Sequence, residues 1–580
     1  MIKLLKVFKK KEFVLIFLIV ALISFGVWLD LKIPDYMSSI TRLVQTEGTT
    51  VSEVLKEGSK MIICAFGSLL SAVIVGYMSS FISATFSKKT RKRLFEKVQT
   101  FSMEEMKKFR TSSLITRTTN DITNIQMFIS MGLQMLIKAP ITAVWAVLKI
   151  LGKGWQWSLA TGICVLVLLI TIGILMIIVI PKFKVIQKLI DNINGVTREN
   201  LNGIRVIRAF NAEKYQESKF EDKNKELTNT QLFTQKRMAI MSPVMYLIMN
   251  LLTLSIYIIG SSMLNNAGMA DRLDIFSNMV VFISYAMQVI MSFLMLAVIF
   301  IMYPRASVSA SRVNEVLDTN AKVLDGDGSN STDIKGEIEF IDVSFKYPDA
   351  DDYLLKNISF KVGKGESLAI IGSTGSGKST IVNLIMRFYD VTDGEILIDG
   401  INIKDYKIED LYKRIGYVPQ KAIMFDESIS YNIAYGSNKI KDNKIKESAE
   451  IARASEFIEK MPKKYKSNVS AGGTNISGGQ KQRLAIARAI AKDPEIYVFD
   501  DSFSALDYKT DYLLRKELKE KEKDKTSVIV AQRIGTIINA DQIIVLDKGM
   551  AVGKGTHKQL LKKCKVYKEI ALSQLSKEEL

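Results

Sequence analysis

The clearest indication of chemistry in the sequence is a glycine-rich segment, Gly372 to Ser379, which fits the pattern G-x-x-x-x-G-K-[ST]. The segment follows an apolar run and opens a helical pattern at Thr380, and a phosphate-binding loop needs this strand–loop–helix context. Its glycines let backbone N–H groups close around phosphate oxygens, and the helix N-terminus adds partial positive charge. Lys378 would neutralise the β- and γ-phosphates, and the Ser379 hydroxyl would ligate Mg²⁺.

A second apolar run, from Ile496 to Phe499, predicts a strand that ends in Asp500. This carboxylate is suited to hold Mg²⁺, directly or through a water. An aspartate at a strand end is common in α/β proteins, but together with the glycine-rich loop it predicts a P-loop ATPase domain that binds ATP and Mg²⁺. The expected nucleotide-binding residues of the loop and first helical turn are Gly372, Ser373, Thr374, Gly375, Ser376, Gly377, Lys378, Ser379 and Thr380.

Between these two elements, the segment Ile476 to Gln480 reads Ile-Ser-Gly-Gly-Gln. A glycine pair between a serine and a helix makes another helix N-terminus that can bind phosphate. It lies about a hundred residues beyond the glycine-rich loop, whose own backbone already encloses the phosphates, so we expect it to contact a γ-phosphate on a second ATPase domain. For this segment alone, a simple helix N-cap by Ser477 is an equally fair interpretation.

Six long apolar stretches precede these motifs. A membrane span needs about 20 apolar residues to cross roughly 30 Å of hydrocarbon, and six such stretches in succession exceed what a soluble core would contain. We therefore predict six membrane helices. The stretches are 13–28, 61–85, 127–151, 157–180, 241–264 and 275–303.

The charge of the chain indicates the orientation of these spans. The 580 residues include 79 Lys and Arg against 60 Asp and Glu, a net charge of +19. Residues 86–126 carry ten basic and four acidic side chains, residues 181–240 carry twelve and seven, and residues 29–60 carry four and five. The positive-inside rule then places the N-terminus and both basic segments in the cytoplasm. We do not expect nucleic acid as a partner, because no basic patch with interleaved aromatic residues occurs.

The two basic segments have few helix breakers and apolar residues at helical spacing, so we predict that the spans continue as helices well past the membrane. Each extension should turn back at a short segment, near residues 111–120 and 211–219. These tips could contact a cytoplasmic partner domain or remain solvated charged helices.

A composition break follows the sixth span, where the polar, glycine-rich residues 324–336 indicate a linker. Beyond it, short strands alternate with helices, as is typical of α/β proteins. We expect an α-helical six-span transmembrane domain with long cytoplasmic helical extensions (1–315), a linker (316–335) and an α/β P-loop nucleotide-binding domain (336–580).

The order of these motifs is similar to that of an ATP-binding cassette domain, and the six preceding spans resemble an ABC exporter half-transporter over essentially the whole chain. Besides the glycine-rich loop, the specific marks are Gln420 after Tyr417-Val418-Pro419, the signature Ile476 to Gln480, and Asp500 followed by Ser504-Ala505-Leu506-Asp507.

The resemblance implies roles for these and other residues. Tyr347 would stack on adenine, Gln420 would couple Mg²⁺ and the attacking water to the membrane helices, and Asp507 would lie between two ATPase domains. Mg²⁺ would be bound by Ser379, Gln420 and Asp500. The signature residues acting on partner-bound ATP would be Ser477, Gly478, Gly479 and Gln480. Two sets resemble the family's cytoplasmic loops: Leu114, Arg117, Asn120 and Asp121 for the first, and Glu199, Gly203, Arg205, Phe210 and Glu213 for the second.

The sequence departs from the family at its hydrolytic positions. The family normally has glutamate after the strand-ending aspartate, to polarise the attacking water, whereas this chain has Asp501, which is one methylene shorter. A carboxylate displaced by about 1 Å loses much of its effect. The family's switch histidine is replaced by Gln532, which can hydrogen-bond a phosphate but cannot carry a proton. The single histidine, His557, lies elsewhere, and residues 471–475 lack the glutamate common before the signature.

An impaired site beside an intact signature resembles one subunit of a heterodimeric, multidrug-type ABC exporter. We expect the chain to pair with a different half-transporter and to export a small amphipathic or drug-like substrate from a bacterial cell membrane, in contact with membrane lipid, with its ATPase domain in the cytoplasm. The alternatives are a slow homodimeric exporter of lipid or peptide, a membrane-tethered regulatory ATPase, and inward transport.

Side chains within the spans leave the substrate open. A methionine recurs at every fourth position on the fifth and sixth spans: Met241, Met245, Met249, Met287, Met291 and Met295. These stripes would suit a promiscuous cavity, although ordinary helix packing is the more common reason for them. We expect Tyr285, Gln288 and Asn250 to face the bundle interior or a cavity. Lys138 and Lys149 should snorkel toward an interface, with an anionic substrate as the alternative for Lys138.

Overall fold

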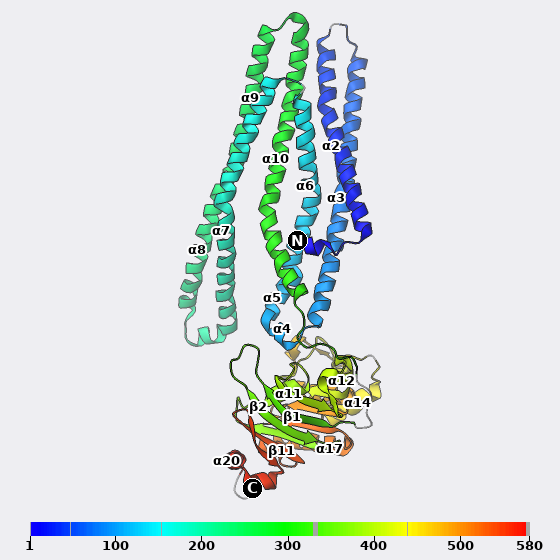
Figure 1. Ribbon diagram of the computed structural model, residues 1–580, viewed down its shortest axis with the longest axis vertical. Helices are drawn as coiled ribbons and strands as arrows, with labels where there is room; N and C mark the ends of the chain where they lie inside the picture. Colours follow the sequence, from blue (N-terminus) through cyan, green and yellow to red (C-terminus); the bar gives the residue numbers. More distant parts are fainter. Residues whose placement is uncertain (1, 47, 152, 329–334, 438, 576–580) are drawn as a thin grey trace. The chain divides into compact units, whose positions relative to one another are not determined.

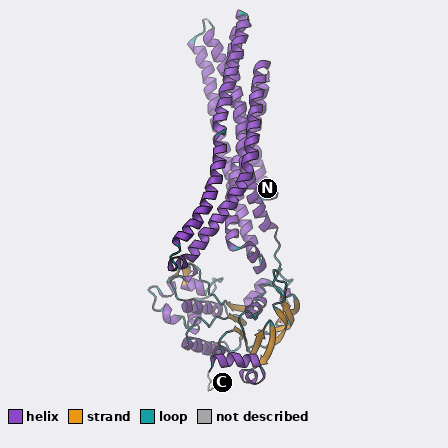
Figure 2. Ribbon diagram, turned by 90° about the vertical axis from the view of Figure 1, so that its left-hand side faces the viewer, coloured by secondary structure: helices purple, strands orange, loops and turns teal. Residues whose placement is uncertain are grey.

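The computed structural model describes residues 2–46, 48–151, 153–328, 335–437 and 439–575. It divides into two compact units. The first comprises Met1–Gln99 and Thr111–Thr319, and the second comprises Thr100–Arg110 and the chain from Asn320 onward. The described residues of the first unit form helices joined by short loops, with no strand (Figure 2), whereas the second unit contains the strands.

The first unit contains six helical segments that are long and apolar enough to cross a membrane, and each predicted span lies within one of them. The prediction of six spans is therefore confirmed. The helix α7 alone has 55 residues, so it extends far beyond the about 20 residues that a span requires. The helices are α1 (Ile2–Leu5), α2 (Lys10–Gln45), α3 (Val51–Gln99), α5 (Thr111–Thr116), the π-helical turn η1 (Arg117–Asp121), α6 (Ile122–Leu151), α7 (Trp155–Ala209), α8 (Glu213–Ala239), α9 (Met241–Asn266) and α10 (Met269–Asp318).

The core of this unit lies where α2, α3, α6 and α10 pack together, with α9 against α10. Phe282 and Ile290 of α10 are fully buried there, beside Ile82 of α3 and Ile19 of α2. By contrast, α7 and α8 form a long hairpin whose lower half stands apart from α6 and α10 (Figure 1). Aromatic side chains at its tip are exposed, Phe210 by 79 % and Tyr215 by 70 %.

The first extension turns back one helix earlier than predicted. We expect the turn near residues 111–120, but the structure places it at Thr100–Arg110, between α3 and α5, with the short helix α4 (Met103–Phe109) inside it. Ser102 starts α4 through a capping box with Glu105, and Arg110 ends it at φ 53°. The sequence does contain this S-x-x-E signal. The second turn lies where predicted, between Ala209 and Glu213.

The threonine-rich residues expected to form the first turn are helical because their hydroxyls bond back to the preceding helical turn. Thr118 donates to the Leu114 carbonyl at 2.7 Å, and Thr119 donates to the Ile115 carbonyl at 2.8 Å. Such back-bonding keeps the hydroxyls satisfied within the helix. The helix widens here into the π-turn η1.

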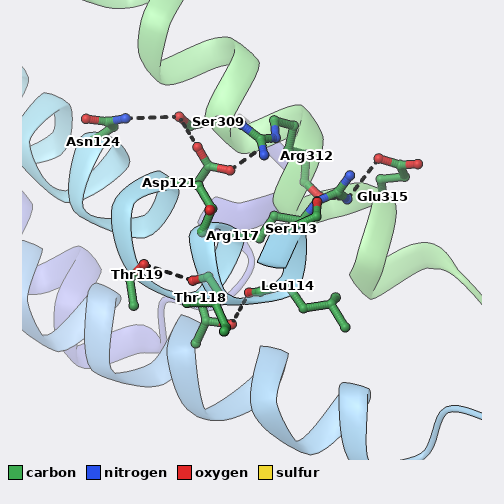
Figure 3. Close-up of polar contacts among 12 residues, drawn as sticks. Ser113, Leu114, Arg117, Thr118, Thr119, Asp121, Asn124, Ser309, Arg312 and Glu315 are labelled. Atoms are coloured by element: carbon green, nitrogen blue, oxygen red, sulfur yellow. Dashed lines mark hydrogen bonds and ion pairs between the residues drawn. The ribbon is translucent and has the colours of Figure 1, made fainter. Parts of the chain in front are cut away.

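This π-turn is attached to the end of α10 by buried charges (Figure 3). The Arg117 guanidinium donates to the Arg312 carbonyl at 2.7 Å and lies 2.8 Å from the Glu315 carboxylate. Asp121 accepts a hydrogen bond from Ser309 at 2.9 Å and lies 3.3 Å from the Arg312 guanidinium. Since Arg117 and Asp121 are both buried, their charges need these partners. The network therefore fixes η1 against the helix that leads out of the unit.

The two lysines of the third span have acidic partners, which the prediction that both snorkel toward an interface did not name. Lys138 of α6 lies 3.2 Å from Asp30 of α2, and Lys149 lies 2.7 Å from Asp35. The Tyr285 hydroxyl of α10 donates to the Asp35 carboxylate at 2.6 Å. An ionised side chain in a span is costly unless it has such a partner. These pairs join α2 to α6 and α10.

The three polar residues predicted to face the bundle interior or a cavity differ in burial. Tyr285 is fully buried, as predicted, and Gln288 is half-buried, but Asn250 is exposed on α9. Met245 belongs to the apolar core, which favours ordinary packing for the stripe on the fifth span. On the sixth span, Met291 is exposed by 46 %.

The second unit is an α/β domain with three sheets. A six-stranded sheet has the order β12-β11-β3-β10-β9-β6, and its strands are parallel except for β12. An antiparallel sheet has the order β2-β1-β4-β5, and β7 pairs with β8. The strands are β1 (Ile338–Phe345), β2 (Leu355–Val362), β3 (Ser367–Gly372), β4 (Asp393–Ile398), β5 (Ile401–Asn402), β6 (Ile415–Val418), β7 (Glu427–Ser428), β8 (Asn468–Val469), β9 (Ile496–Asp500), β10 (Thr526–Val530), β11 (Gln542–Asp547) and β12 (Met550–Gly555).

Both faces of the large sheet are buried. Successive side chains of a strand point to opposite faces, so Leu368 and Ile370 of β3 enter one apolar cluster while Ala369 and Ile371 enter the other. The first cluster includes the small sheet, and the second lies under most of the helices. The helices are α11 (Lys378–Ile385), η2 (Ile403–Asp405), α12 (Ile408–Arg414), α13 (Ile429–Ile433), α14 (Asp442–Ile451), α15 (Ser455–Ile458), η3 (Lys464–Lys466), η4 (Ala471–Gly473), α16 (Gly478–Ala491), α17 (Tyr508–Lys521), α18 (Ile534–Ile537), α19 (His557–Lys563) and α20 (Lys565–Gln574).

Part of the expected linker is attached to the α/β domain. The Gly326 N–H donates to the Tyr406 carbonyl at 3.1 Å, and Asp325 accepts from the Ile408 N–H at 2.8 Å. The Arg387 guanidinium donates to the Leu324 carbonyl at 2.8 Å. Residues 329–334 of this segment lie outside the described residues.

The pair between α2 and α6 makes a prediction. Lys138→Met leaves the Asp30 charge without its partner inside a span, so we expect the thermal unfolding midpoint of the lipid-reconstituted chain to fall by roughly 5 °C. The double variant Asp30→Asn with Lys138→Met removes both charges and should recover most of that loss. Lys56→Met, at an exposed lysine of α3, is the control. Equal midpoints for the single and double variants would show that the pair does not matter.

Candidate nucleotide site

The sheet brings the predicted motifs to one edge. Strands β6, β9, β10 and β3 are parallel neighbours, and Val530 of β10 is in register with both Ile370 of β3 and Asp500 of β9. The carboxyl ends of parallel strands meet at the same edge of a sheet, where ligands of α/β proteins bind. The glycine-rich loop follows β3, Asp500 ends β9, and Gln420 and Gln532 follow β6 and β10, two residues after each strand ends.

Glycine is required within the loop for two separate reasons. Gly375 and Gly377 have φ angles of +83° and +99°, in the left-handed region that favours glycine. A Cβ on Gly372 would lie 2.2 Å from the Leu546 carbonyl oxygen, so only glycine fits between β3 and β11. The helix α11 begins at Lys378, directly after this loop, which confirms the strand–loop–helix context.

The polar side chains of the loop suit phosphate and a hard cation. The Lys378 ammonium donates to the Gly372 and Ser373 carbonyls at 2.8 and 2.7 Å. Burial lowers its pKa, against the opposing effect of the two nearby carboxylates. The Ser376 hydroxyl is buried, and it makes no hydrogen bond within the described part of the chain. The Ser379 hydroxyl donates to Asp500 at 3.0 Å, so two oxygen ligands of the kind that Mg²⁺ prefers lie together.

Asp500 carries its charge at a cost. Burial raises the pKa of its carboxyl, the Ser379 hydrogen bond lowers it, and the neighbouring Asp501 raises it again, so that the net shift is upward. A cation beside it would offset this cost. The residues present therefore fit Mg²⁺.

Asp501 is held by two amides that the sequence does not reveal as partners. Its Oδ2 accepts hydrogen bonds from the Gln420 amide at 3.1 Å and from the Gln532 amide at 2.8 Å. The side chain is buried, and its backbone is left-handed at φ 48°. Such strained positions cluster at functional sites. Gln420 and Gln532, which are expected at the hydrolytic position together with Asp501, thus both donate to the same Asp501 oxygen.

Tyr347 borders the helix that follows the loop. Its hydroxyl lies 3.1 Å from the Thr380 hydroxyl, and its ring meets the rings of Phe345 and Tyr389 edge to face. The Lys107 ammonium of α4 lies 5.8 Å from the centre of the Tyr347 ring, which places α4 beside the residue expected to stack on adenine.

The signature begins the long helix α16. The Ser477 hydroxyl accepts from the Gln480 N–H at 3.3 Å, and the Gln480 side chain accepts from the Ser477 N–H at 2.9 Å, which is a capping box. A Cβ on Gly479 would lie 3.2 Å from the Ala505 carbonyl oxygen, so the signature contacts the segment that ends in Asp507. Asp507 caps α17, and the pKa of its exposed carboxyl is lowered chiefly by the Thr510 N–H.

Several residues that position the site lie far apart in the sequence. The Ser502 hydroxyl donates to the Val418 carbonyl at 2.8 Å, and the Gln482 amide donates to the Pro419 carbonyl at 3.1 Å. Arg533 donates to the Ser504 carbonyl at 3.2 Å. No local sequence pattern predicts these contacts. His557 lies elsewhere, as expected, with its Nδ1 2.8 Å from the Tyr567 hydroxyl.

Comparisons with known proteins agree with this geometry. The family model described as ABC transporter matches residues 355–504, and the model described as ABC transporter transmembrane region matches residues 13–293. An uncharacterized ABC transporter ATP-binding protein of Mycobacterium tuberculosis is 36 % identical over 93 % of this chain and 93 % of its own length. The chain is an ABC transporter.

Other relatives of the transporter come from several bacteria. The uncharacterized ABC transporter ATP-binding protein YfiB of Bacillus subtilis is 35 % identical over 90 % of each chain. An ATP-dependent lipid A-core flippase of Pseudomonas aeruginosa is 32 % identical over 77 % of this chain and 73 % of that one. A solved bacterial Atm1-family ABC exporter with ATP bound superposes with a TM-score of 0.84 at 24 % identity, covering 98 % of this chain and 99 % of that one, and it shows the same fold.

These findings confirm the predicted family, fold class and enzyme class. The transporter is a multi-pass membrane protein with one membrane region fused to one ATP-binding cassette, and that cassette belongs to the family that hydrolyses ATP during transport. As a transporter it binds ATP, a substrate and membrane lipid.

The raised pKa of Asp500 makes a prediction about stability. The native carboxyl is uncharged at low pH and pays for burial only as the pH rises through its raised pKa. Asp500→Asn keeps an oxygen acceptor for Ser379 and removes that charge, so without Mg²⁺ it should raise the unfolding midpoint at pH 8 by about 2–4 °C. The gain should disappear at low pH, where the native carboxyl is itself protonated.

Differential scanning calorimetry in EDTA at several pH values measures this difference. Asp511→Asn is the matched control, because Asp511 is paired with Arg515 at 2.7 Å and its loss should lower the midpoint. A midpoint of Asp500→Asn below that of the wild type at pH 8 would refute the cost assigned to Asp500.

Proposed function

We propose that this transporter is one half of a heterodimeric ABC exporter that moves a small amphipathic or drug-like substrate outward at the expense of ATP. Its own site would bind ATP and hydrolyse it slowly, while its signature would complete the competent site of a different half-transporter. The observation that carries this proposal is the convergence of the Gln420 and Gln532 amides on Asp501.

The chemistry of that convergence favours slow hydrolysis. A general base must reach the attacking water, but Asp501 is one methylene shorter than glutamate, and the two amides hold its carboxylate at that shorter reach. Gln532 can donate to a phosphate oxygen but cannot take up a proton. The site therefore has the parts to bind a nucleotide and lacks two of the parts that would speed its hydrolysis.

The signature retains what a partner's site needs. The N-terminus of α16 presents exposed Ser477 and Gly478, with backbone N–H groups and a helix dipole that suit the γ-phosphate of ATP bound by the partner. Its contact with the residues before Asp507 would let that phosphate influence the surface expected between the two cassettes.

Mg²⁺ would be held by Ser379 and Asp500, with Gln420 as the third expected ligand, and would supply charge neutralisation for the phosphates. In this structure the Gln420 amide is directed at Asp501, so it would turn to reach the ion. The cassette and the N-terminus would face the cytoplasm of a bacterial cell, as the loop charges indicate.

Exposed surfaces support a second subunit. Phe210 and Tyr215 at the tip of the α7–α8 hairpin are large and uncovered, although they lie beyond the predicted span. The cassette has a pocket of about 420 Å³ lined by Tyr431, Tyr435 and Ile445. We propose that the hairpin tip rests on the partner's cassette and that the pocket receives the partner's tip.

The drug-like substrate rests on family resemblance, and the flippases among the relatives make lipid the main alternative. A slow homodimer, a tethered regulator and inward transport remain outcomes of the experiments. Transport of a fluorescent amphipathic probe or a fluorescent lipid in sealed vesicles separates them, since a tethered regulator would move neither probe, and the sign of accumulation gives the direction.

Restoring the two hydrolytic positions should raise turnover. We expect Asp501→Glu with Gln532→His to increase ATP hydrolysis at this chain's site about tenfold or more, because the carboxylate gains reach and the switch position gains a proton carrier. Asp501→Asn should not increase it. An unchanged rate with a competent partner present would count against the impaired-site proposal.

Co-expression tests the division of labour. We expect the ATPase rate of the lipid-reconstituted chain alone to be low, to rise sharply with one different half-transporter, and to fall again with Ser477→Ala in this chain. Asn402→Ala removes the helix cap of η2, away from the signature and the proposed partner pocket, and is the control for loss of a cap alone. A high rate for the chain alone, unchanged by any partner, would mean that Asp501 and Gln532 suffice and that the transporter is a homodimer.

A further inference from the structure

One side chain on the last described helix holds the segment that carries Gln532. The Gln574 side chain of α20 accepts a hydrogen bond from the Ile534 N–H at 2.8 Å and donates one to the Gln532 carbonyl at 2.8 Å. A carboxamide offers one acceptor and two donors, so a single residue satisfies backbone groups on both sides of Arg533. Gln574 is 40 positions from Ile534 and 42 positions from Gln532 in the sequence.

The segment that Gln574 holds, Gln532 to Ile534, contacts the hydrolytic position directly. The Gln532 amide donates to Asp501 at 2.8 Å, and Arg533 donates to the Ser504 carbonyl, near Asp507. The position of the Gln532 backbone determines where its side-chain amide can lie, because that amide is hydrogen-bonded to Asp501. A shift of about 1 Å at such a position is enough to change a rate by orders of magnitude.

The helix α20, which carries Gln574, is packed firmly against the rest of the domain. Tyr567 and Ala571 of α20 are fully buried in the same apolar cluster as Leu560 of α19. The Tyr567 hydroxyl also lies 2.8 Å from the ring of His557. A site residue is held well when its support is packed into the core, and α20 provides that support although Gln574 itself is exposed.

We propose that Gln574 is a positioning residue for ATP hydrolysis: it holds the Gln532 backbone so that the Gln532 amide meets Asp501. The inference rests on the proposed function only in that this chain's own site hydrolyses ATP slowly. It gives the C-terminal helices a part in the reaction, because any movement of α20 is transmitted to Gln532 through one carboxamide.

The test uses the full chain purified alone in lipid, where every nucleotide site is formed by copies of this chain. Single-turnover hydrolysis of radiolabelled ATP with the transporter in excess registers slow rates. We expect Gln574→Ala to lower the maximal rate about tenfold while the ATP concentration for half-maximal rate changes less than about twofold. Ser573→Ala, whose hydroxyl only bonds within α20, should leave both values unchanged.

Two further measurements distinguish positioning from a general loss of structure. In a Gln532→Ala background, Gln574→Ala should have little additional effect, because the residue through which it acts is gone. Amide hydrogen exchange of residues 532–537 should become faster in Gln574→Ala, while residues 496–500 of β9 keep their protection.

Equal loss of rate in both backgrounds, unchanged exchange at 532–537, or no single-turnover hydrolysis by the wild-type chain would each overturn the inference. The failure of the proposed heterodimer has a different signature. It would appear as a high absolute rate for the chain alone and would leave the ratios between these paired variants unaffected.

Discussion

The nucleotide site depends on the parallel alignment of β3, β10, β9 and β6. Because neighbouring parallel strands end at one edge, loops that lie up to 160 residues apart deliver their side chains to the same place. The glycine-rich loop can sit there only because Gly372 lets β3 approach β11 closely. A change in strand order would separate Ser379 from Asp500, whose hydrogen bond marks the centre of the site.

Two adjacent buried carboxylates set the electrostatics of that edge. Asp501 raises the pKa of the Asp500 carboxyl, and one cation and several neutral donors lie close to the two carboxylates. Lys378 supplies the positive charge, while Ser379 and the two glutamine amides supply hydrogen bonds. Neutral donors of this kind stabilise an ionised carboxylate.

Charged side chains of the membrane unit also have partners close to them. The two lysines of the third span pair with acidic residues of α2, as Lys138–Asp30 and Lys149–Asp35, and the buried charges of η1 are paired with α10. These contacts connect helices that apolar packing alone would leave free to slide. Ionic contacts of this kind can specify one arrangement among several packed alternatives.

Features that depend on a local pattern could be predicted from the amino-acid sequence. Six spans, long extensions, a P-loop at Gly372–Ser379 and a cassette were all predicted, because span length, loop charge and glycine spacing are read within a few residues. Where local signals compete, the prediction was less accurate: the first turn lies at Ser102–Arg110 rather than in the threonine-rich segment, whose hydroxyls bond back into the helix.

The contacts between side chains that are distant in the sequence could be seen only in the folded chain. The pairing of Lys138 with Asp30, the two amides on Asp501 and the hold of Gln574 on Gln532 join residues separated by 31 to 108 positions. Their types are ordinary, and no spacing marks them. Such contacts are fixed by helix packing and strand order, which place a lysine, a glutamine or a carboxylate within hydrogen-bond reach once the whole chain has folded.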